Sequence, residues 1–169
     1  MQDRSGRRAA TVATVAMTLG AALAGLPAMA ADWVIGAGVA DFDAGSETAV
    51  SVEVHGAPVW VPGRVEIGPA AGAVVDTDGS VWVGAGLSAL AELGPRWFLE
   101  ASVMPGAFDE GSAATDLGHG LEIRSLIGLG YSLSAATKVS IAVDHRSNAG
   151  LGDRNPGVNT VSLRLRRTF

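Results

Sequence analysis

A histidine and a serine two residues apart end a strongly alternating segment of this chain. His145 and Ser147 continue the phase of Val139, Ile141 and Val143. Residues i and i+2 of a β-strand project from the same face about 7 Å apart, a gap that an imidazole can span to reach a hydroxyl. These are the base and the nucleophile of acyl transfer, in which histidine accepts the proton as the serine oxygen attacks an ester carbonyl. The spacing predicts a serine-esterase site on one face of a strand.

The same pair also has a simpler interpretation. The H-x-S spacing is common, and polar residues normally occupy the rim of a membrane barrel. The pair could therefore be ordinary rim residues.

Asn159 shares the phase of Val161 in the last alternating segment, which predicts that it lies beside His145 across a pair of strands. His55 and His119 have no serine or other candidate catalytic residue at a comparable spacing, so we expect them to be solvated loop or turn residues.

Residues 1–30 have the pattern of a secretory signal peptide: a basic start with three arginines, an apolar run over 9–26 and an A-x-A cleavage site at 28–30. A transmembrane anchor is the alternative. The cleavage site and the many Ala, Gly and Thr residues favour the signal peptide. We therefore expect residues 31–169 to form the mature barrel domain.

Composition limits the class of protein. The chain has 169 residues, 48% of them hydrophobic, and no cysteine. This length suits one domain, and the absence of cysteine is compatible with export through an oxidising compartment. Acidic residues outnumber basic ones by 17 to 12, giving a net charge of −5, so a nucleic-acid partner is not expected. Charges, Gly or Pro interrupt each later apolar run before the roughly 20 residues of a helical span.

Alternation of period two predicts an all-β chain of eight strands, the number found in the smallest outer-membrane barrels. The predicted strands are 32–42, 48–57, 59–70, 79–93, 96–104, 119–133, 137–147 and 158–169. Clusters of Gly, Pro, Asp and Ser separate them. The boundaries of the second and third strands have the weakest signals.

A soluble sheet and a membrane barrel place these alternating faces differently. The barrel turns its apolar face to lipid and its polar face to the lumen, and the signal peptide and terminal Phe169 favour it. In lipid the sheet must close, because every backbone polar group needs a partner. We therefore expect an antiparallel up-and-down transmembrane barrel of the outer membrane. Its lumen would hold an ion-pair network of Glu100, Glu122, Arg124, Asp144, Arg164 and Arg166.

The final third of the chain carries longer motifs. They are His145-Arg146-Ser147-Asn148-Ala149-Gly150-Leu151, then Asn155-Pro156-Gly157-Val158-Asn159, with Leu121-Glu122-Ile123-Arg124 and Gly128-Leu129-Gly130-Tyr131 upstream. With these motifs, over roughly residues 119–169, the chain resembles the lipid A 3-O-deacylase (PagL) family of outer-membrane acyl hydrolases. The resemblance implies an eight-stranded barrel with its active site on the outer wall, which hydrolyses the ester at position 3 of lipid A without a metal or other cofactor.

The resemblance also implies roles for five residues. His145 would be the general base and Ser147 the nucleophile. Asn148, with nearby backbone N–H groups, would stabilise the oxyanion, and Asn155 would shape the site. Asn159 stands where the best-known members have Glu; it can orient an imidazole but carries no charge to stabilise imidazolium. Weaker activity, or another orienting group such as Asp153, is the alternative that this departure leaves open.

Three rival functions remain compatible with the sequence: a structural or adhesive small barrel, a soluble periplasmic lipid-binding barrel, and a phospholipid acyl hydrolase using the same dyad. Arg146 and Arg154 either attract anionic lipopolysaccharide or are solvated at the rim, and Arg167 is expected to reach headgroups. The expected partners are lipid A and the outer membrane, and a homodimer is left open.

Overall fold

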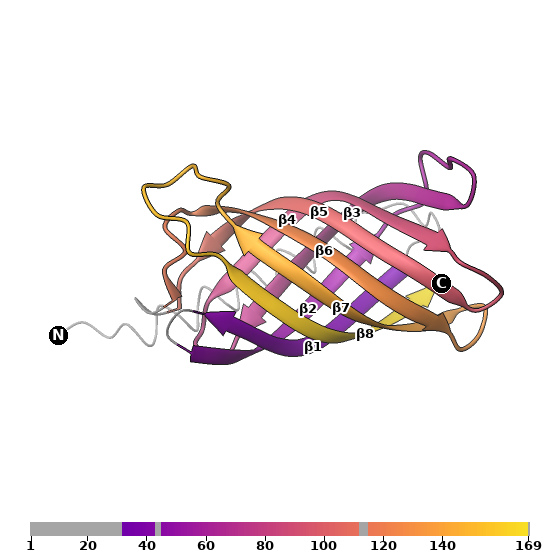
Figure 1. Ribbon diagram of the computed structural model, residues 1–169, viewed down its shortest axis with the longest axis horizontal. Coiled ribbons are helices and arrows are strands. Elements are labelled where there is room, and N and C mark those ends of the chain that lie inside the picture. The colour runs from indigo at the N-terminus through magenta and orange to yellow at the C-terminus, as the bar shows by residue number, and fades with distance from the viewer. Residues whose placement is uncertain (1–31, 43–44, 112–114, 169) are drawn as a thin grey trace.

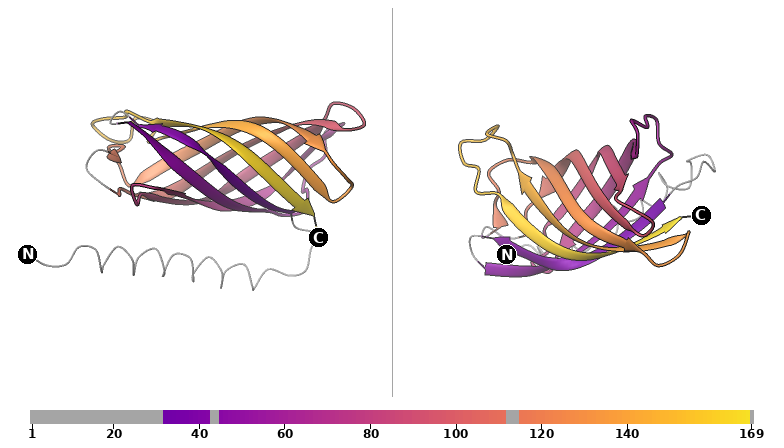
Figure 2. Two further views of the ribbon diagram at one scale, coloured as in Figure 1. Left: turned by 90° about the horizontal axis from the view of Figure 1, so that it is seen from below. Right: turned by 45° about the vertical axis from the view of Figure 1, so that its right-hand side comes forward.

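The structure, a computed structural model, describes residues 32–42, 45–111 and 115–168. Its strands are β1 (Asp32–Phe42), β2 (Gly45–His55), β3 (Val65–Asp76), β4 (Val81–Glu92), β5 (Trp97–Asp109), β6 (Leu121–Ser132), β7 (Thr137–Ser147) and β8 (Val158–Thr168). Each strand pairs antiparallel with the next, and β8 pairs with β1, which closes the barrel (Figures 1 and 2). The predicted up-and-down barrel is confirmed. The predicted signal peptide and Phe169 lie outside the described residues.

The barrel has two ends. Connections 77–80, 110–120 and 148–157 lie at one end, which we call the loop end (Figure 1). Connections 56–64, 93–96 and 133–136 lie at the other, where β1 begins and β8 finishes; we call it the terminal end. None of the helical stretches in the described part of the chain has the length and apolar character of a membrane span.

The predicted bounds of the second and third strands are wrong by several residues. The stretch from Gly56 to Arg64 forms a connection instead of the start of the third strand. Pro62 precedes Gly63, whose φ of +66° belongs to the left-handed region that glycine tolerates. The fifth strand also continues five residues beyond its predicted end, through Pro105 to Asp109. Pro105 has no N–H to donate, and the β4–β5 pairing is interrupted beside it.

An ion-pair network fills the lumen toward the terminal end. Glu53 accepts hydrogen bonds from Arg124 at 2.8 Å and from Arg164 at 2.7 and 3.0 Å. Arg124 also binds Asp144, and Arg164 binds Glu100. The predicted inward charges are all buried, but the carboxylate oxygens of Glu122 have no hydrogen-bond partner among the described residues. The sequence interpretation missed Glu53, which lies at the centre of this network.

His55 contradicts the prediction of a solvated residue. It is buried in the lumen, and its Nε2 lies 2.8 Å from Glu53 Oε2. His55 is the last residue of β2 and faces inward. The predicted strand 48–57 already contained it, so the error was to treat it as a loop residue and not as part of the inward phase of that strand. His119 is exposed, as expected, and its Nδ1 accepts a hydrogen bond from Leu121 N.

An apolar layer closes the lumen toward the loop end. It contains Ala40, Ala49, Ala70, Val74, Trp82, Met104, Leu117 and Val158. Trp82 donates to the carbonyl of Glu122 at 3.1 Å, and a Cβ at Gly106 would lie only 2.6 Å from the indole ring. An interior cavity of about 10 Å³ next to this layer has room for about one water. A lumen filled in this way is a packed core, as expected for eight strands.

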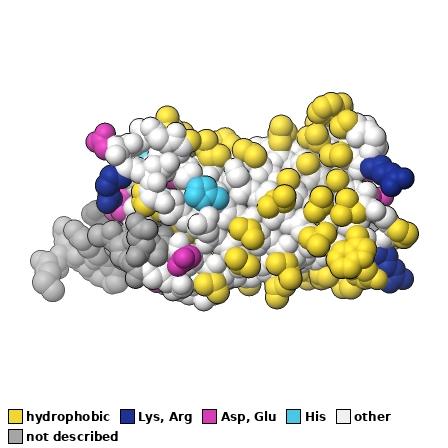
Figure 3. Space-filling view, in the orientation of Figure 1, with side chains coloured by type: hydrophobic (Ala, Val, Ile, Leu, Met, Phe, Trp, Pro, Cys, Tyr) yellow, Lys and Arg dark blue, Asp and Glu magenta, His cyan; other side chains and the backbone are white. Residues whose placement is uncertain are grey.

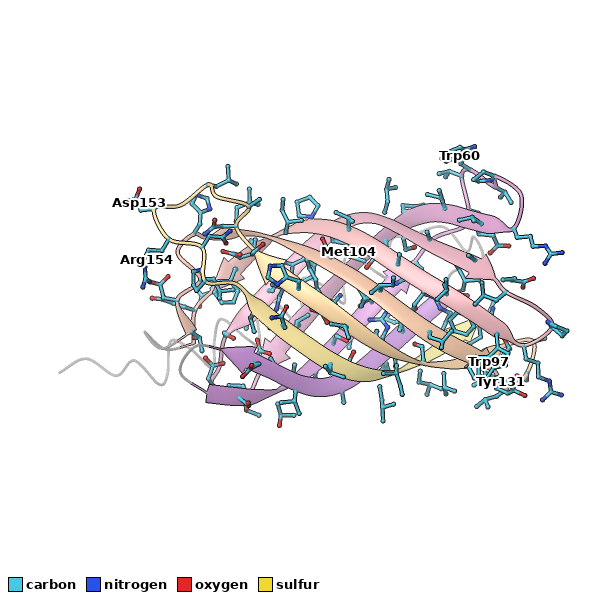
Figure 4. The ribbon with its side chains drawn as sticks, viewed as in Figure 1. Trp60, Trp97, Met104, Tyr131, Asp153 and Arg154 are labelled. Carbon is cyan, nitrogen blue, oxygen red and sulfur yellow. The ribbon has the colours of Figure 1, made fainter. Side chains whose placement is uncertain are left out.

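The outer wall is mostly apolar. Figure 3 shows hydrophobic side chains over much of it and Lys and Arg side chains at its ends. Trp97 and Tyr131 contact edge to face at the terminal end, with ring centroids 5.2 Å apart (Figure 4). Arg167 is exposed near this end and donates to Thr137 Oγ1 at 2.7 Å. The wall therefore has an apolar band, with basic side chains at both ends and aromatic side chains at the terminal end, as suits a bilayer.

Candidate functional site on the outer wall

A polar row crosses the apolar wall near the loop end. The register pairs Ser125 of β6 with His145 of β7, His145 with Asn159 of β8, and Asn159 with Asp41 of β1. All four side chains are exposed on the outer face. Ser147 stands one step closer to the loop end on β7, opposite Ile123. The structure thus brings the predicted base, nucleophile and orienting residue together on one surface.

The imidazole of His145 is held by Asn159. Its Nδ1 lies 2.9 Å from Asn159 Oδ1. An amide oxygen can only accept, so Nδ1 carries the proton in this pair and the neutral ring has its lone pair on Nε2. This is the tautomer that a general base requires. Asn159 can therefore orient the histidine even though it carries no charge.

Gly157 lies against the other edge of the same ring. A Cβ at this position would lie 2.8 Å from His145 Cε1 and 3.3 Å from Nε2. Its φ of +67° is also in the left-handed region. Continuing the register of β7 and β8 places Gly157 opposite Ser147, so the Cε1–Nε2 edge faces the level of the serine. The Asn155-Pro156-Gly157 motif was a signal for this role, but the sequence interpretation did not assign one to the glycine.

Two serines flank His145. Ser125 lies directly across the ladder on β6, and Ser147 lies two residues further along β7. The described part of the chain gives neither hydroxyl a hydrogen bond, so the expected Ser147–His145 bond is not formed in this structure. Catalytic hydrogen bonds often shorten only when substrate is bound. The Cε1–Nε2 edge lies against Gly157, which is level with Ser147, and this favours Ser147 over Ser125 as the candidate nucleophile.

Asn148 braces the loop that follows Ser147. Its side chain is fully buried and donates to the carbonyls of Leu117 at 2.9 Å and Arg154 at 2.7 Å, and its Oδ1 accepts from Gly150 N. Its own backbone N–H donates to Asn155 Oδ1 at 3.0 Å. The predicted oxyanion role does not fit these contacts, because all its N–H groups are already used. Asn148 instead joins the 148–157 connection to the 110–120 connection.

Asn155 and two charged residues occupy the same connection. Asn155 is exposed and, among described residues, uses only its Oδ1, leaving its Nδ2 without a hydrogen bond next to the end of β7. Asp153 and Arg154 lie at the outer tip of the loop (Figure 4). Arg154 pairs with Asp116, and both side chains are largely exposed. Asp153 is therefore badly placed to orient the imidazole.

Arg146 contradicts the prediction that it lies at the site or the rim. It is completely buried in the lumen, and its NH2 lies 3.0 Å from Asp76 Oδ2 on β3. The alternation of the strand already indicated this position, because a residue between the outward His145 and Ser147 must point inward. The pair ties the end of β7 that carries His145 and Ser147 to β3, on the far side of the barrel.

A closed eight-stranded barrel with an apolar wall, a filled lumen and a serine, histidine and asparagine gathered outside defines a class: small outer-membrane barrels with a candidate ester-hydrolase site. The family model described as lipid A 3-O-deacylase (PagL) matches residues 68–168. The chain belongs to this family. The match extends the resemblance back from residue 119 into β3.

Individual relatives agree with this assignment. The lipid A deacylase PagL of Bordetella bronchiseptica is 32% identical over 71 residues, which span 41% of this chain and 40% of that relative. The crystal structure of the outer membrane enzyme PagL superposes with a TM-score of 0.68 at 21% identity, covering 80% of this chain and 98% of that one. A de novo designed transmembrane β-barrel (TM-score 0.53, 7% identity, covering 82% and 95%) and Neisserial surface protein A (0.52, 12%, covering 83% and 96%) share the fold.

Proposed function

We propose that this chain is a lipid A 3-O-deacylase of the outer membrane, which hydrolyses the acyl ester at position 3 with a serine-esterase site on its lipid-facing wall. The observation that carries the proposal is the hydrogen bond from His145 Nδ1–H to Asn159 Oδ1. It presents a basic Nε2 on the outer wall beside the level of Ser147. Family membership supplies the substrate class.

The reaction follows from the roles of these atoms. Ser147 Oγ bonds to the ester carbonyl carbon as its proton passes to His145 Nε2. The bond to the sugar oxygen then breaks, and that oxygen takes the proton from Nε2. Water next attacks the acyl-serine, its proton passing through Nε2 to Ser147 Oγ as the fatty acid leaves. Lipid A is left with a free hydroxyl at position 3.

The surface around the site suits an amphiphilic substrate. Val143 of β7, Ile127 of β6 and Val161 of β8 are exposed on the wall immediately on the terminal side of the polar row. An acyl chain lying along this wall would stay in an apolar environment while its ester reaches the polar row. The sugar headgroup would then lie toward the loop end. Hydrolysis needs no extraction of the lipid from the membrane.

Asn155 is the side chain best placed to assist the oxyanion. Its Oδ1 accepts from the backbone N–H of the residue after Ser147, so its amide lies close to the nucleophile. Its Nδ2 is not used within the described residues. A positioned amide donor of this kind stabilises a tetrahedral oxyanion and is worth about 10²–10³ in turnover. Asn148 would contribute indirectly, by fixing the loop that carries Asn155.

The test is mass spectrometry of lipid A from cells that express the chain, compared with Ser147→Ala. We expect wild type to remove the 3-linked acyl chain and Ser147→Ala to remove none. Ser125→Ala is the matched control, because it deletes a hydroxyl beside the same imidazole and should keep the activity. Unchanged lipid A with the protein confirmed in the outer membrane would sink the proposal. Loss of a phospholipid acyl chain instead would move the substrate to that class.

A further inference from the structure

Asp41 is the carboxylate nearest in register to the orienting asparagine. It lies directly opposite Asn159 in the β1–β8 pairing, and both side chains are exposed on the outer face. Asn159 uses its Oδ1 for His145, and among described residues its Nδ2 has no partner. Asp41 Oδ1 accepts only a long hydrogen bond of 3.4 Å from Ser46. A free amide donor and a lightly held carboxylate therefore face each other.

We propose that the negative charge of the catalytic triad is supplied in this chain by Asp41, acting through the Asn159 amide as a positioning residue for His145. The inference rests on the proposed function. Directly opposed side chains of an antiparallel pair have Cβ atoms about 4.5–5.5 Å apart, a gap that Asp and Asn close by rotating. Asn159 Nδ2–H then donates to Asp41 while Oδ1 still accepts from His145 Nδ1–H.

This arrangement of Asp41, Asn159 and His145, which we call the relay, performs two tasks that a lone asparagine cannot. It fixes which way the Asn159 amide faces, because the flipped amide would present an N–H to Nδ1 and favour the wrong tautomer. It also brings a carboxylate to the same side of the imidazole, where it stabilises the imidazolium formed during the reaction. Asp153 can do neither from the tip of its loop.

The experiment is a double-mutant cycle on purified protein with lipid A in detergent micelles. Asp41→Asn should lower kcat about tenfold with little change in KM, well below the ~10⁴ cost of neutralising an acid in direct contact with histidine. Asp109→Asn is the matched control, since Asp109 is also an exposed acid at the loop end of its strand. In an Asn159→Glu background, where the acid contacts His145 directly, Asp41→Asn should have almost no effect.

Two results would overturn the relay. One is Asp41→Asn behaving like Asp109→Asn in the wild-type background. The other is the same loss of kcat with Asn159 or Glu at position 159, because a general surface or folding effect would be independent of that residue.

A second measurement separates the relay from the choice of substrate. A fluorophosphonate probe forms a Ser147 Oγ–phosphorus bond as fluoride leaves and the serine proton passes to His145, without any lipid. We expect Asp41→Asn to slow this labelling about tenfold, while Asp109→Asn leaves its rate unchanged. Labelling of Ser147 together with unchanged lipid A would reject the proposed substrate, and equal labelling rates of the two variants would reject the relay.

Discussion

At the scale of single residues, the site depends on two small residues that contact the imidazole of His145 and set its orientation. Asn159 holds Nδ1, and Gly157 leaves room for the Cε1–Nε2 edge. Because His145 is exposed on the wall, its orientation comes from these two neighbours and not from core packing. A change of one methyl group beside the ring should therefore alter catalysis more than stability.

We expect Gly157→Ala to lower kcat by about 10²-fold, because the new methyl group would displace the ring and a shift of about 1 Å costs roughly that much. Steady-state kinetics on lipid A would measure the effect. Gly63→Ala is a matched control: its φ of +66° imposes similar backbone strain, but nothing lies within 4 Å of the added Cβ. Equal kcat values for the two variants would refute the role of Gly157 in positioning the His145 ring.

At the scale of secondary-structure elements, β7 carries the proposed base and the proposed nucleophile, so its end must be held from inside the barrel. Arg146 lies between these two residues in the sequence and reaches Asp76 across the lumen. The 148–157 connection is held by the buried side chain of Asn148. A strand end that would otherwise fray is thus fixed by one buried ion pair and one braced loop.

We expect Asp76→Ala to destabilise the barrel by about 3–5 kcal/mol, because it removes a buried carboxylate to which the buried Arg146 donates hydrogen bonds. Arg154→Ala should cost at most about 1 kcal/mol, because its pair with Asp116 is exposed. Urea unfolding in detergent, followed by the shift of the folded band on unheated gels, would compare them. Similar urea midpoints for Asp76→Ala and Arg154→Ala would contradict the role of the Asp76–Arg146 pair in anchoring β7. Asp76→Leu combined with Arg146→Met should recover most of the loss.

At the scale of the whole molecule, the barrel inverts the usual arrangement of a soluble protein. Its wall is apolar and its interior holds acids and arginines that neutralise one another. Among the described residues, Glu53 makes the most hydrogen bonds of this network: two with Arg164, one with Arg124 and one with His55. The ion-pair network and the apolar layer together fill the lumen, so the interior is a packed core that supports the wall.

We expect Glu53→Gln to destabilise the folded barrel by about 3–5 kcal/mol, because two buried arginines lose the charge that they share. Thermal unfolding followed by circular dichroism would measure the change. Glu66→Gln, at an exposed position on β3, should be close to neutral. A Glu53→Gln barrel as stable as the Glu66→Gln barrel would show that the network contributes little to folding.

The sequence by itself determined the fold class and predicted the central residues of the candidate site. Period-two alternation is a local property, so the chain alone assigned β7 its bounds and placed His145 and Ser147 on the outer phase. Phase also placed Asn159 beside His145, and the resemblance added its role. The same alternation pointed Arg146 inward, but the prediction put it at the site or the rim and was wrong. Strand ends near Pro62 and Pro105 could not be placed, because proline stops some strands and is tolerated in others.

Only the tertiary structure decided what lies across the barrel or across its closure. Asp76 and Arg146 are 70 residues apart in sequence, and their contact depends on the width of the closed lumen. Asp41 meets Asn159 only because β8 pairs with β1. The bonds that occupy the Asn148 amide likewise depend on two loops meeting at one end. Registers and loop contacts of this kind follow from closure of the whole sheet, which no local pattern encodes.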